Sequence, residues 1–299
     1  IESYDSIGIG EKVMEKLGLV LEGGGIRGAY TAGALEWLKD NNVKFDYYVG
    51  ISSGAAYLSF YLEDRVEVAH KMATYYTCQK DVVGLKALLR CGHYVDYQRV
   101  FEEDMRKKEG MNVDKIISEN LPMEVGCYDL AQGKTIYFNA EQLDREMKII
   151  RGACALPIAS AVVDVNGYRL MDGGITKMIP IERALEQNCT KCLVITTKPK
   201  DYVRKPSSKI ICWLMKLIYR ECPQMAKDYK VRHLNYYKQR KIIDDMCEKG
   251  DAINIYPSKT LKVSRWKGDP ATCEELYQLG YSDMEKQKDQ IFALLQNRE

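Results

Sequence analysis

Two glycine-rich turns, each directly after a short apolar run, restrict the folds that this chain can adopt. Residues 16–21 (KLGLVL) predict a buried strand, and the turn at residues 23–28 (GGGIRG) follows it at once. Residues 47–49 predict a second strand, which runs into the turn at residues 50–54 (GISSG). Helical segments follow both turns and are expected over residues 29–39 and 55–64. This repeated strand–turn–helix order predicts a parallel sheet covered by helices.

Later segments add antiparallel hairpins to this α/β pattern. Residues 125–130 and 135–138 flank one expected hairpin turn. Residues 161–165 and 168–171 flank an Asn-Gly pair, the strongest short hairpin signal in the sequence. Further elements are expected as helices within 65–120 and over 143–153, strands at 192–196 and 253–256, and a helical tail from residue 282. The stretch between 198 and 209, rich in proline and lysine, is expected to be a linker or an ordered loop.

Composition excludes some classes of protein. The formal net charge is +2 over 299 residues, which argues against a nucleic-acid binder that relies on bulk charge. Ten cysteines without a disulfide framework favour reduced thiols in a cytoplasmic protein. No signal peptide is visible, and no run of about 18 apolar residues predicts a spanning helix.

Ser52 is the first candidate catalytic residue. It stands between Gly50 and Gly54, where a strand is expected to turn sharply into a helix. Small residues on both sides of such a bend leave the residue at its apex exposed and strained, which suits a nucleophile. The motif also occurs in ordinary turns, so its meaning depends on the residues around it.

The loop at residues 23–28 has two functional interpretations. Gly23, Gly25 and Gly28 match the G-x-G-x-x-G pattern of dinucleotide-binding loops. However, Asp46 precedes the second strand, whereas the acid that binds ribose follows it. The same consecutive glycines point backbone amides into one small space at a helix start, as an oxyanion on a tetrahedral intermediate requires. A third interpretation is a tight turn that only packs helix against strand.

A serine nucleophile needs a neighbouring residue that accepts its proton. The three histidines, His70, His93 and His233, lie in contexts typical of ordinary surface or core residues. Asp172 is better placed, because it ends an expected strand and precedes Gly173-Gly174. Partial burial would raise the pKa of this carboxyl and make it a better base. Taken alone, the D-G-G sequence also fits a plain turn.

These three elements, in this order, resemble the patatin-like phospholipases over roughly residues 17–197. That family has a G-G-G-x-R/K-G loop, then G-x-S-x-G, then D-G-A/G far downstream. The resemblance implies a three-layer α/β/α fold with a mixed, mostly parallel sheet, and a Ser52–Asp172 dyad without histidine. It also implies that the amides of Gly23, Gly24 and Gly25 form an oxyanion hole. The remaining motif positions are Arg27, Gly28, Gly50, Gly54, Gly173 and Gly174.

The resemblance has consequences for function and domain organisation. It implies a lipid acyl hydrolase that cleaves carboxylic esters through an acyl-enzyme, with no metal and no other cofactor. Residues 1–200 are expected to form the catalytic domain, and residues 201–299 a mainly helical extension packed on it, as in a bacterial branch of the family. The family often has Asn-x-Pro after D-G-G, whereas Met178-Ile179-Pro180 here lacks the amide. A nucleotide-binding protein and a non-catalytic lipid-binding protein on the same scaffold remain alternatives.

Two further features have alternative interpretations. The segment Ile210–Tyr219 is strongly apolar and flanked by basic residues, so it predicts either transient contact with a membrane surface or a core or lid helix. Cys189-x-x-Cys192 fits redox chemistry or half of a zinc site, but without a second pair at matching spacing structural cysteines are favoured.

Overall fold

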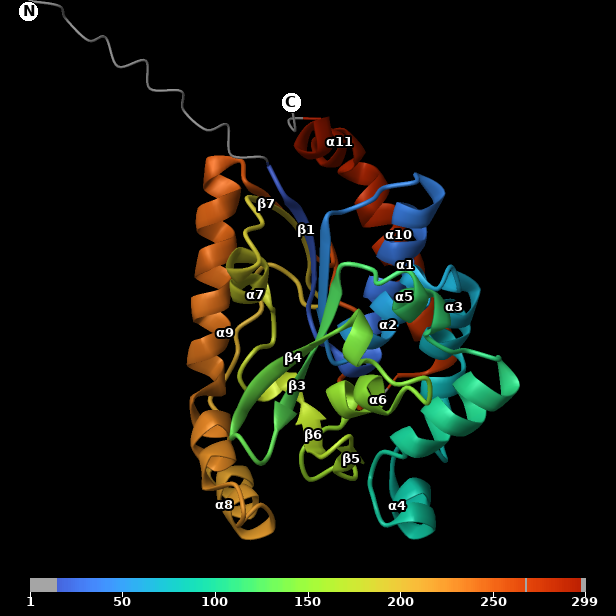
Figure 1. The fold of residues 1–299 in the computed structure, drawn as a ribbon, viewed down its shortest axis with the longest axis vertical. Helices are drawn as coiled ribbons and strands as arrows, with labels where there is room; N and C mark the ends of the chain where they lie inside the picture. The colour runs from blue at the N-terminus through green and yellow to red at the C-terminus, as the bar shows by residue number, and fades with distance from the viewer. Residues whose placement is uncertain (1–14, 267, 297–299) are drawn as a thin grey trace, which may run out of the picture.

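The computed structural model describes residues 15–266 and 268–296. These residues form one eight-stranded sheet in the order β5-β6-β3-β2-β1-β7-β8, with β4 paired to β3 (Figure 1). The strands are β1 (Leu17–Leu21), β2 (Tyr47–Ile51), β3 (Met123–Asp129), β4 (Lys134–Asn139), β5 (Val163–Val165), β6 (Tyr168–Asp172), β7 (Lys191–Ile195) and β8 (Ala252–Ile255). The central run from β3 to β8 is parallel, while β4, β5 and β6 join antiparallel. The predicted mixed, mostly parallel sheet is confirmed.

Helices cover both faces of this sheet. The principal ones are α1 (Ala29–Asp40), α2 (Ser53–Leu62), α3 (Val66–Thr74), α6 (Lys148–Cys154), α7 (Ile181–Glu186), α9 (Pro223–Lys249) and α10 (Pro270–Lys286). Shorter or peripheral ones are η1 (Gly25–Gly28), η2 (Tyr76–Cys78), α4 (Leu85–Cys91), η3 (Arg99–Lys108), α5 (Asp114–Ser118), η4 (Ala140–Gln142), η5 (Gly173–Ile175), α8 (Lys209–Ile218) and α11 (Lys288–Gln296). Among them, η3 is a π-helix.

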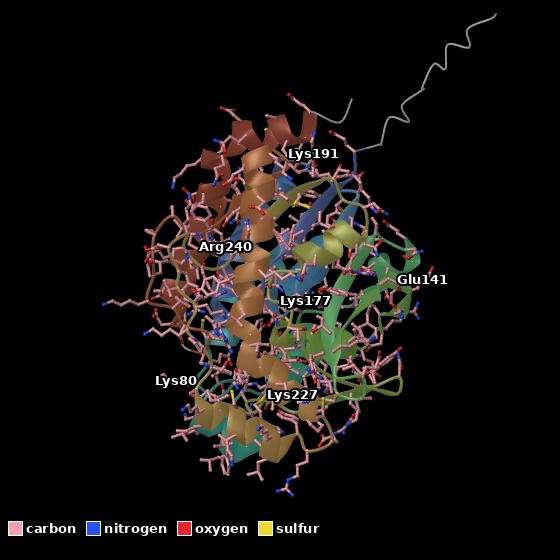
Figure 2. All side chains as sticks on the ribbon, turned by 90° about the vertical axis from the view of Figure 1, so that its left-hand side faces the viewer. Lys80, Glu141, Lys177, Lys191, Lys227 and Arg240 are labelled. Carbon is pink, nitrogen blue, oxygen red and sulfur yellow. The ribbon has the colours of Figure 1, made fainter. Side chains whose placement is uncertain are left out.

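The central strands are buried on both faces, which explains their continuous apolar sequence. Leu19 and Leu21 of β1 pack into the core with α1 and α2, whereas Val20 packs with α7 and α9 on the opposite face. Figure 2 shows α9 lying across the strands on that second face. The chain therefore has the predicted three-layer α/β/α architecture.

The C-terminal region is joined to this architecture by strand pairing and by close helix packing. β8 pairs in parallel with β7, and α10 packs against α1. A Cβ on Gly33 of α1 would lie 1.9 Å from the Tyr277 carbonyl oxygen, and one on Gly280 of α10 would lie 2.0 Å from the Tyr30 carbonyl oxygen. The two glycines therefore allow backbone-to-backbone contact at this crossing.

Most predicted elements are present, and two boundaries are wrong. Both hairpins form, and Asn166 and Gly167 adopt the positive φ angles, 50° and 82°, of a tight turn. The helix expected from residue 143 starts only at Lys148, because the Asp144 carboxylate accepts the first amides of the helix. The tail helix starts at Pro270 rather than residue 282, since Asp269 caps it and proline is favoured in its first turn.

Within the described ranges, every helix is too short or too polar to cross a bilayer.

Candidate active site

Ser52 occupies a strained turn between β2 and α2. Its φ and ψ angles are 55° and −127°, a region that costs a non-glycine residue roughly 1–3 kcal/mol. The neighbouring glycines are required by close backbone contacts. A Cβ on Gly50 would lie 2.7 Å from the Ala55 nitrogen, and one on Gly54 would lie 2.8 Å from the Leu21 carbonyl oxygen. The predicted sharp strand-to-helix turn is confirmed, but the predicted exposure of the residue at its apex is wrong, since Ser52 is only 4% exposed.

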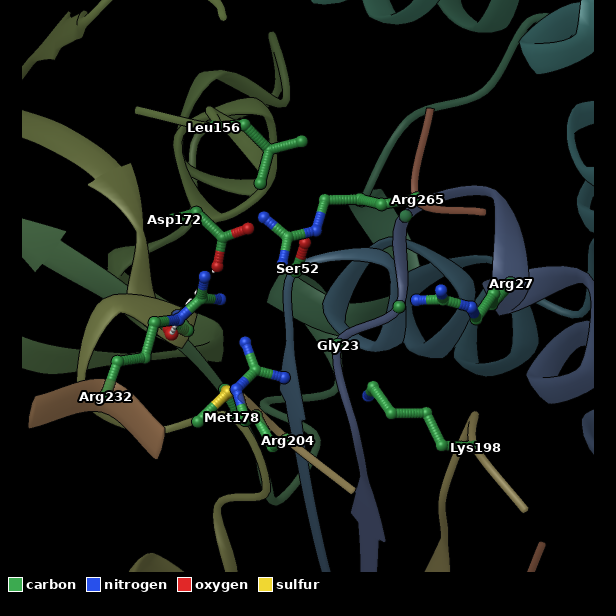
Figure 3. A pocket seen from close by; sticks show the side chains of 13 residues that line it. Gly23, Arg27, Ser52, Leu156, Asp172, Met178, Lys198, Arg204, Arg232 and Arg265 are labelled. Atoms are coloured by element: carbon green, nitrogen blue, oxygen red, sulfur yellow. Dashed lines mark hydrogen bonds between the residues drawn. The ribbon is translucent and has the colours of Figure 1, made fainter. Parts of the chain in front are cut away.

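Asp172 reaches Ser52 because β2 and β6 are both neighbours of β3. Ile51, the last residue of β2, is in register with Gly126, and Asp172 is in register with Cys127. Glycine at this crossing leaves room: a Cβ on Gly173 would lie 2.5 Å from the Gly126 carbonyl oxygen. Figure 3 shows the two side chains in the same pocket. Sheet pairing thus joins two residues that are distant in sequence.

The Asp172 carboxyl is buried and has a raised pKa. Its side chain is only 3% exposed, and it accepts a 2.7 Å hydrogen bond from the Gly174 amide. Burial raises the pKa, while the Arg232 guanidinium, the Ser52 hydroxyl and the Gly174 amide act in the opposite direction. Burial prevails, so this carboxyl is a stronger base than an exposed aspartate.

The glycine loop lies directly against Ser52. A Cβ on Gly23 would lie 2.9 Å from the Ser52 Cβ. The Gly23 amide donates to the Met178 carbonyl at 3.1 Å, and the Gly24 amide donates to the Ser53 hydroxyl at 2.8 Å. Gly25, with φ of 61°, opens η1, and its amide has no acceptor in the described part of the chain.

A buried ion pair holds the residue that directly precedes the glycine loop. Glu22, at the end of β1, accepts from the ammonium of Lys198 and from the backbone amide of Thr197 at 2.7 Å. Glu22 and Lys198 are 0% and 4% exposed. Burial lowers the pKa of Lys198 to about 8 despite the opposing effect of Glu22. No motif in the sequence marks this pair.

Two pockets meet at Ser52. One is lined by Ser52, Asp172 and five basic side chains: Arg27, Lys198, Arg204, Arg232 and Arg265 (Figure 3). The other is lined mainly by apolar side chains: Ile26, Tyr57, Met72, Val82, Val83, Val95, Tyr97, Val100, Cys154 and Trp266. Gly25, Ser52 and Arg265 line both. The serine therefore separates a cationic space from an apolar one.

The histidines and the cysteine pair lie elsewhere. His70 contacts Glu274 at 2.6 Å, and none of the three histidines lines either pocket. Cys189 and Cys192 are buried beside β1, where a Cβ on Gly18 would lie 3.0 Å from the Cys189 sulfur. Their surroundings are those of packed core side chains.

Three arginines of this pocket come from the C-terminal half of the chain, and the sequence alone did not identify them as site residues. Arg204 lies in the loop after β7, Arg232 on α9, and Arg265 in the loop before α10. Each lies in a polar segment among other basic residues, and no spacing or motif distinguishes it. Only the packing of α9 on the sheet and of α10 on α1 brings these segments to Ser52.

Gln239 of α9 supports the segment that lacks the family's asparagine amide. Its carboxamide oxygen accepts from the amides of Met178 and Ile179 at 3.2 and 3.1 Å, and its nitrogen donates to the Thr176 carbonyl. Gln239 is 1% exposed. A side chain from the C-terminal extension therefore fixes the backbone at Met178, whose carbonyl accepts the hydrogen bond from the Gly23 amide.

Comparison with known proteins agrees with this fold and these motifs. A strained serine after a parallel strand, facing a buried carboxylate beside a glycine loop, is an arrangement suited to acyl transfer. The family model of the patatin-like phospholipases matches residues 19–185, more than half of the chain, and the chain belongs to this family of lipid hydrolases. A second model, a domain of unknown function named DUF6363, matches residues 222–296.

The chain is also similar to a curated bacterial protein and to a solved bacterial structure. The chain is 26% identical over 282 residues to the uncharacterized protein YjjU of Escherichia coli (strain K12), with 89% of this chain and 75% of that protein covered. The crystal structure of VipD from Legionella pneumophila matches with a TM-score of 0.45 and 12% identity, over 92% of this chain and 67% of VipD.

Proposed function

We propose that this protein is a lipid acyl hydrolase that cleaves carboxylic esters with Ser52 as nucleophile and Asp172 as base. The observation that carries the proposal is the position of Ser52 between two unlike pockets. An apolar pocket suits an acyl chain, and a polar pocket next to the nucleophile suits the rest of a lipid ester. The strained turn and the buried Asp172 carboxyl supply the reactive groups.

The reaction then follows from these groups. The Ser52 hydroxyl attacks the ester carbonyl, and Asp172 accepts its proton. As the tetrahedral intermediate collapses, the carbon–oxygen bond to the alcohol breaks and Asp172 returns the proton to the leaving oxygen. A water molecule, deprotonated by Asp172, next attacks the acyl-enzyme. The fatty acid is released, and the proton returns to Ser52.

The glycine loop is proposed to bind the oxyanion. The amides of Gly23 and Gly24 donate to protein acceptors in the resting structure, whereas that of Gly25 finds no acceptor within residues 15–266 and 268–296. Gly25 is therefore proposed as the first donor, and Gly24 as a donor that exchanges the Ser53 hydroxyl for the oxyanion. One such donor stabilises a transition state by about 3–4 kcal/mol in known enzymes.

The alternatives receive less support. In a dinucleotide-binding site the pyrophosphate would occupy the space beside the glycine loop, but here that loop packs against the Ser52 Cβ. A non-catalytic scaffold would not need a serine held at a costly backbone angle beside a buried carboxylate.

A fluorophosphonate probe tests the proposal directly. We expect the wild-type protein to become labelled at Ser52, because the probe reacts only with an activated serine. Ser59→Ala, which alters another buried serine on α2, should label as the wild type does. Mass spectrometry locates the adduct. Absence of labelling in the folded wild-type protein, or labelling at another serine, would overturn the proposed role of Ser52.

We also propose that α8 contacts a membrane surface. Its apolar side chains are exposed, with Ile210 at 72% and Trp213 at 60%, and Lys209 and Lys216 lie on the same helix. Such a helix fits the interface of an anionic membrane. Figure 1 shows α8 and α4, which exposes Leu85 and Leu89, at the same end of the molecule.

A short path links this surface to the active site. The hydroxyl of Tyr219, directly after α8, accepts a 2.9 Å hydrogen bond from the Ile158 amide. Leu156, two residues before Ile158, lines the pocket that contains the five basic side chains. This contact therefore joins the end of α8 to the segment that lines the pocket.

Vesicle binding tests the role of α8. The double change Ile210→Ser and Trp213→Ser should weaken binding to phosphatidylglycerol-containing vesicles by at least about 10-fold, since two apolar side chains no longer insert. Leu234→Ser, at an exposed apolar site on α9, is the matched control. Co-sedimentation measures the bound fraction. Equal binding of the double variant and the control would exclude α8 as the contact.

A further inference from the structure

The pocket beside Ser52 contains more positive charge than the described residues neutralise through ion pairs. Lys198 is paired with Glu22. In contrast, none of the four arginines that line the pocket has a carboxylate oxygen within 4 Å in residues 15–266 and 268–296. Asp172 lies near Arg232 and Arg265 and influences them electrostatically, but forms an ion pair with neither. These arginines therefore have no ion-pair partner among the described residues, and their charges face the same space.

Two of these arginines are as buried as core residues. Arg204 is 9% exposed and Arg232 is 8% exposed. A buried charge without an opposite charge is costly in a folded protein, and groups of this kind are concentrated at functional sites. Structural packing alone does not account for arginine at both positions.

Neutral groups hold the arginines in place. Arg232 donates through Nε to the Gly174 carbonyl at 2.6 Å and through one terminal nitrogen to the Tyr229 hydroxyl at 3.4 Å. The Arg204 guanidinium lies over the Tyr236 ring, 5.4 Å from its centroid. Each arginine has five N–H donors, so most remain for a ligand. Figure 3 shows the guanidinium groups of Arg204, Arg232 and Arg265 around the space next to Ser52 and Asp172.

The electrostatic effect of the cluster is visible on Tyr229. Burial raises the pKa of this phenol, but Arg232, Arg265 and Arg204 together outweigh burial, so its pKa is lowered. The pKa of Arg232 itself is lowered to about 10, by burial and by the nearby Arg265. The cluster therefore creates a strongly positive potential where a ligand would sit.

We infer that Arg204, Arg232 and Arg265 bind a phosphate monoester, and that the preferred substrates are acyl esters carrying such a group. This inference rests on the proposed hydrolase function and names its substrate class. Arginine pairs with phosphate oxygens through two parallel hydrogen bonds, and a dianion matches several guanidiniums. The ester would lie over Ser52, its acyl chain in the apolar pocket and its phosphate in the arginine cluster.

The geometry disfavours a zwitterionic headgroup such as phosphocholine. Its quaternary ammonium would enter a space lined by five basic side chains. Asp172, the carboxylate that lines this pocket, is required for the reaction. An acyl glycerol phosphate places a dianion there and no cation.

The test compares three esters of the same acyl chain: 1-acyl-glycerol 3-phosphate, the matching lysophosphatidylcholine and the uncharged monoacylglycerol. We expect wild-type kcat/KM to be highest for the phosphate monoester. Arg204→Gln and Arg265→Gln should each lower the ratio of kcat/KM for the phosphate monoester to that for monoacylglycerol by about 10- to 100-fold. Arg204→Lys keeps the charge and should lower the ratio less. Arg240→Gln, on α9 but outside the pocket, is the matched control.

Two results would overturn the inference. One is a wild-type enzyme that hydrolyses monoacylglycerol or lysophosphatidylcholine as well as the phosphate monoester. The other is an equal loss for all three esters in the arginine variants. Short-chain and long-chain acyl glycerol phosphates distinguish a soluble substrate from a lipid, since a lipid-directed enzyme should prefer the long chain.

A binding measurement separates this inference from the proposed hydrolase function. The ether analogue 1-alkyl-glycerol 3-phosphate cannot be hydrolysed, so its affinity for Ser52→Ala, measured by calorimetry, does not depend on turnover. Binding that Arg204→Gln weakens by at least about 10-fold supports the phosphate site even if no ester is cleaved. Failure of this analogue to bind while Ser52 still reacts with a fluorophosphonate would overturn the phosphate site alone.

Discussion

Replacing Ser52 by alanine is expected to lower kcat for a short-chain p-nitrophenyl ester by about 10⁴-fold or more. The reason is that loss of a nucleophile removes the acyl-enzyme path altogether, and serine hydrolases lose activity on this scale. Folding should be retained, because alanine fills the same space and the turn is held by Gly50, Gly54 and the loop at residues 23–25. Initial rates on purified protein measure the effect.

Two controls make this result specific. Circular dichroism and thermal unfolding of Ser52→Ala should match the wild type, so that lost activity is not lost structure. Replacing His70, His93 and His233 together should spare most activity, since none lines a pocket at Ser52. Wild-type turnover in Ser52→Ala would exclude Ser52 as nucleophile. A comparable loss from one histidine change would indicate a triad instead.

The sequence predicted the catalytic centre better than the pocket around it. Ser52 and Asp172 lie at turns whose glycines are dictated by local backbone geometry, so a local pattern marks them. The central strands were predictable for the same reason, since short continuous apolar runs bounded by glycine are typical of buried strands. Such signals are short-range and can be read from a single sequence.

Arg204, Arg232 and Arg265 carry no such signal. They matter because no carboxylate among the described residues neutralises them. This arrangement depends on the packing of segments that lie more than 150 residues from Ser52 in the sequence. The Gly33–Gly280 contact illustrates the same limit: each glycine lies within a helix, and only the crossing of α1 and α10 explains it. The tail helix starts earlier than predicted, at Pro270, although Asp269 can cap it and Cys273, Leu276 and Tyr277 have helical spacing.

The raised pKa of Asp172 sets the second large expectation, which concerns both activity and stability. Asp172→Asn should lower kcat by about 10⁴-fold, because the amide cannot accept the Ser52 proton. In the wild type, kcat/KM should rise with pH as Asp172 ionises, along an acid limb above the ordinary aspartate value of about 3.9. Arg232→Gln removes a charge that lowers this pKa, so its acid limb should move to higher pH.

Asp172→Asn should raise the stability of the protein while it lowers the activity. A carboxyl whose pKa is higher in the folded than in the unfolded state stabilises the fold below the unfolded value, and this contribution is lost as the pH rises through the folded value. At pH 8, above the unfolded value, the ionised form of Asp172 favours the unfolded chain, whereas asparagine keeps the acceptor for the Gly174 amide and carries no charge in either state. Asp172→Asn should be more stable than the wild type in urea at pH 8, and the difference should shrink as the pH falls toward about 4. The proposed mechanism requires a base that is held at a cost in stability. If Asp172→Asn is inactive and also less stable than the wild type at pH 8, Asp172 serves the fold rather than the proton transfer.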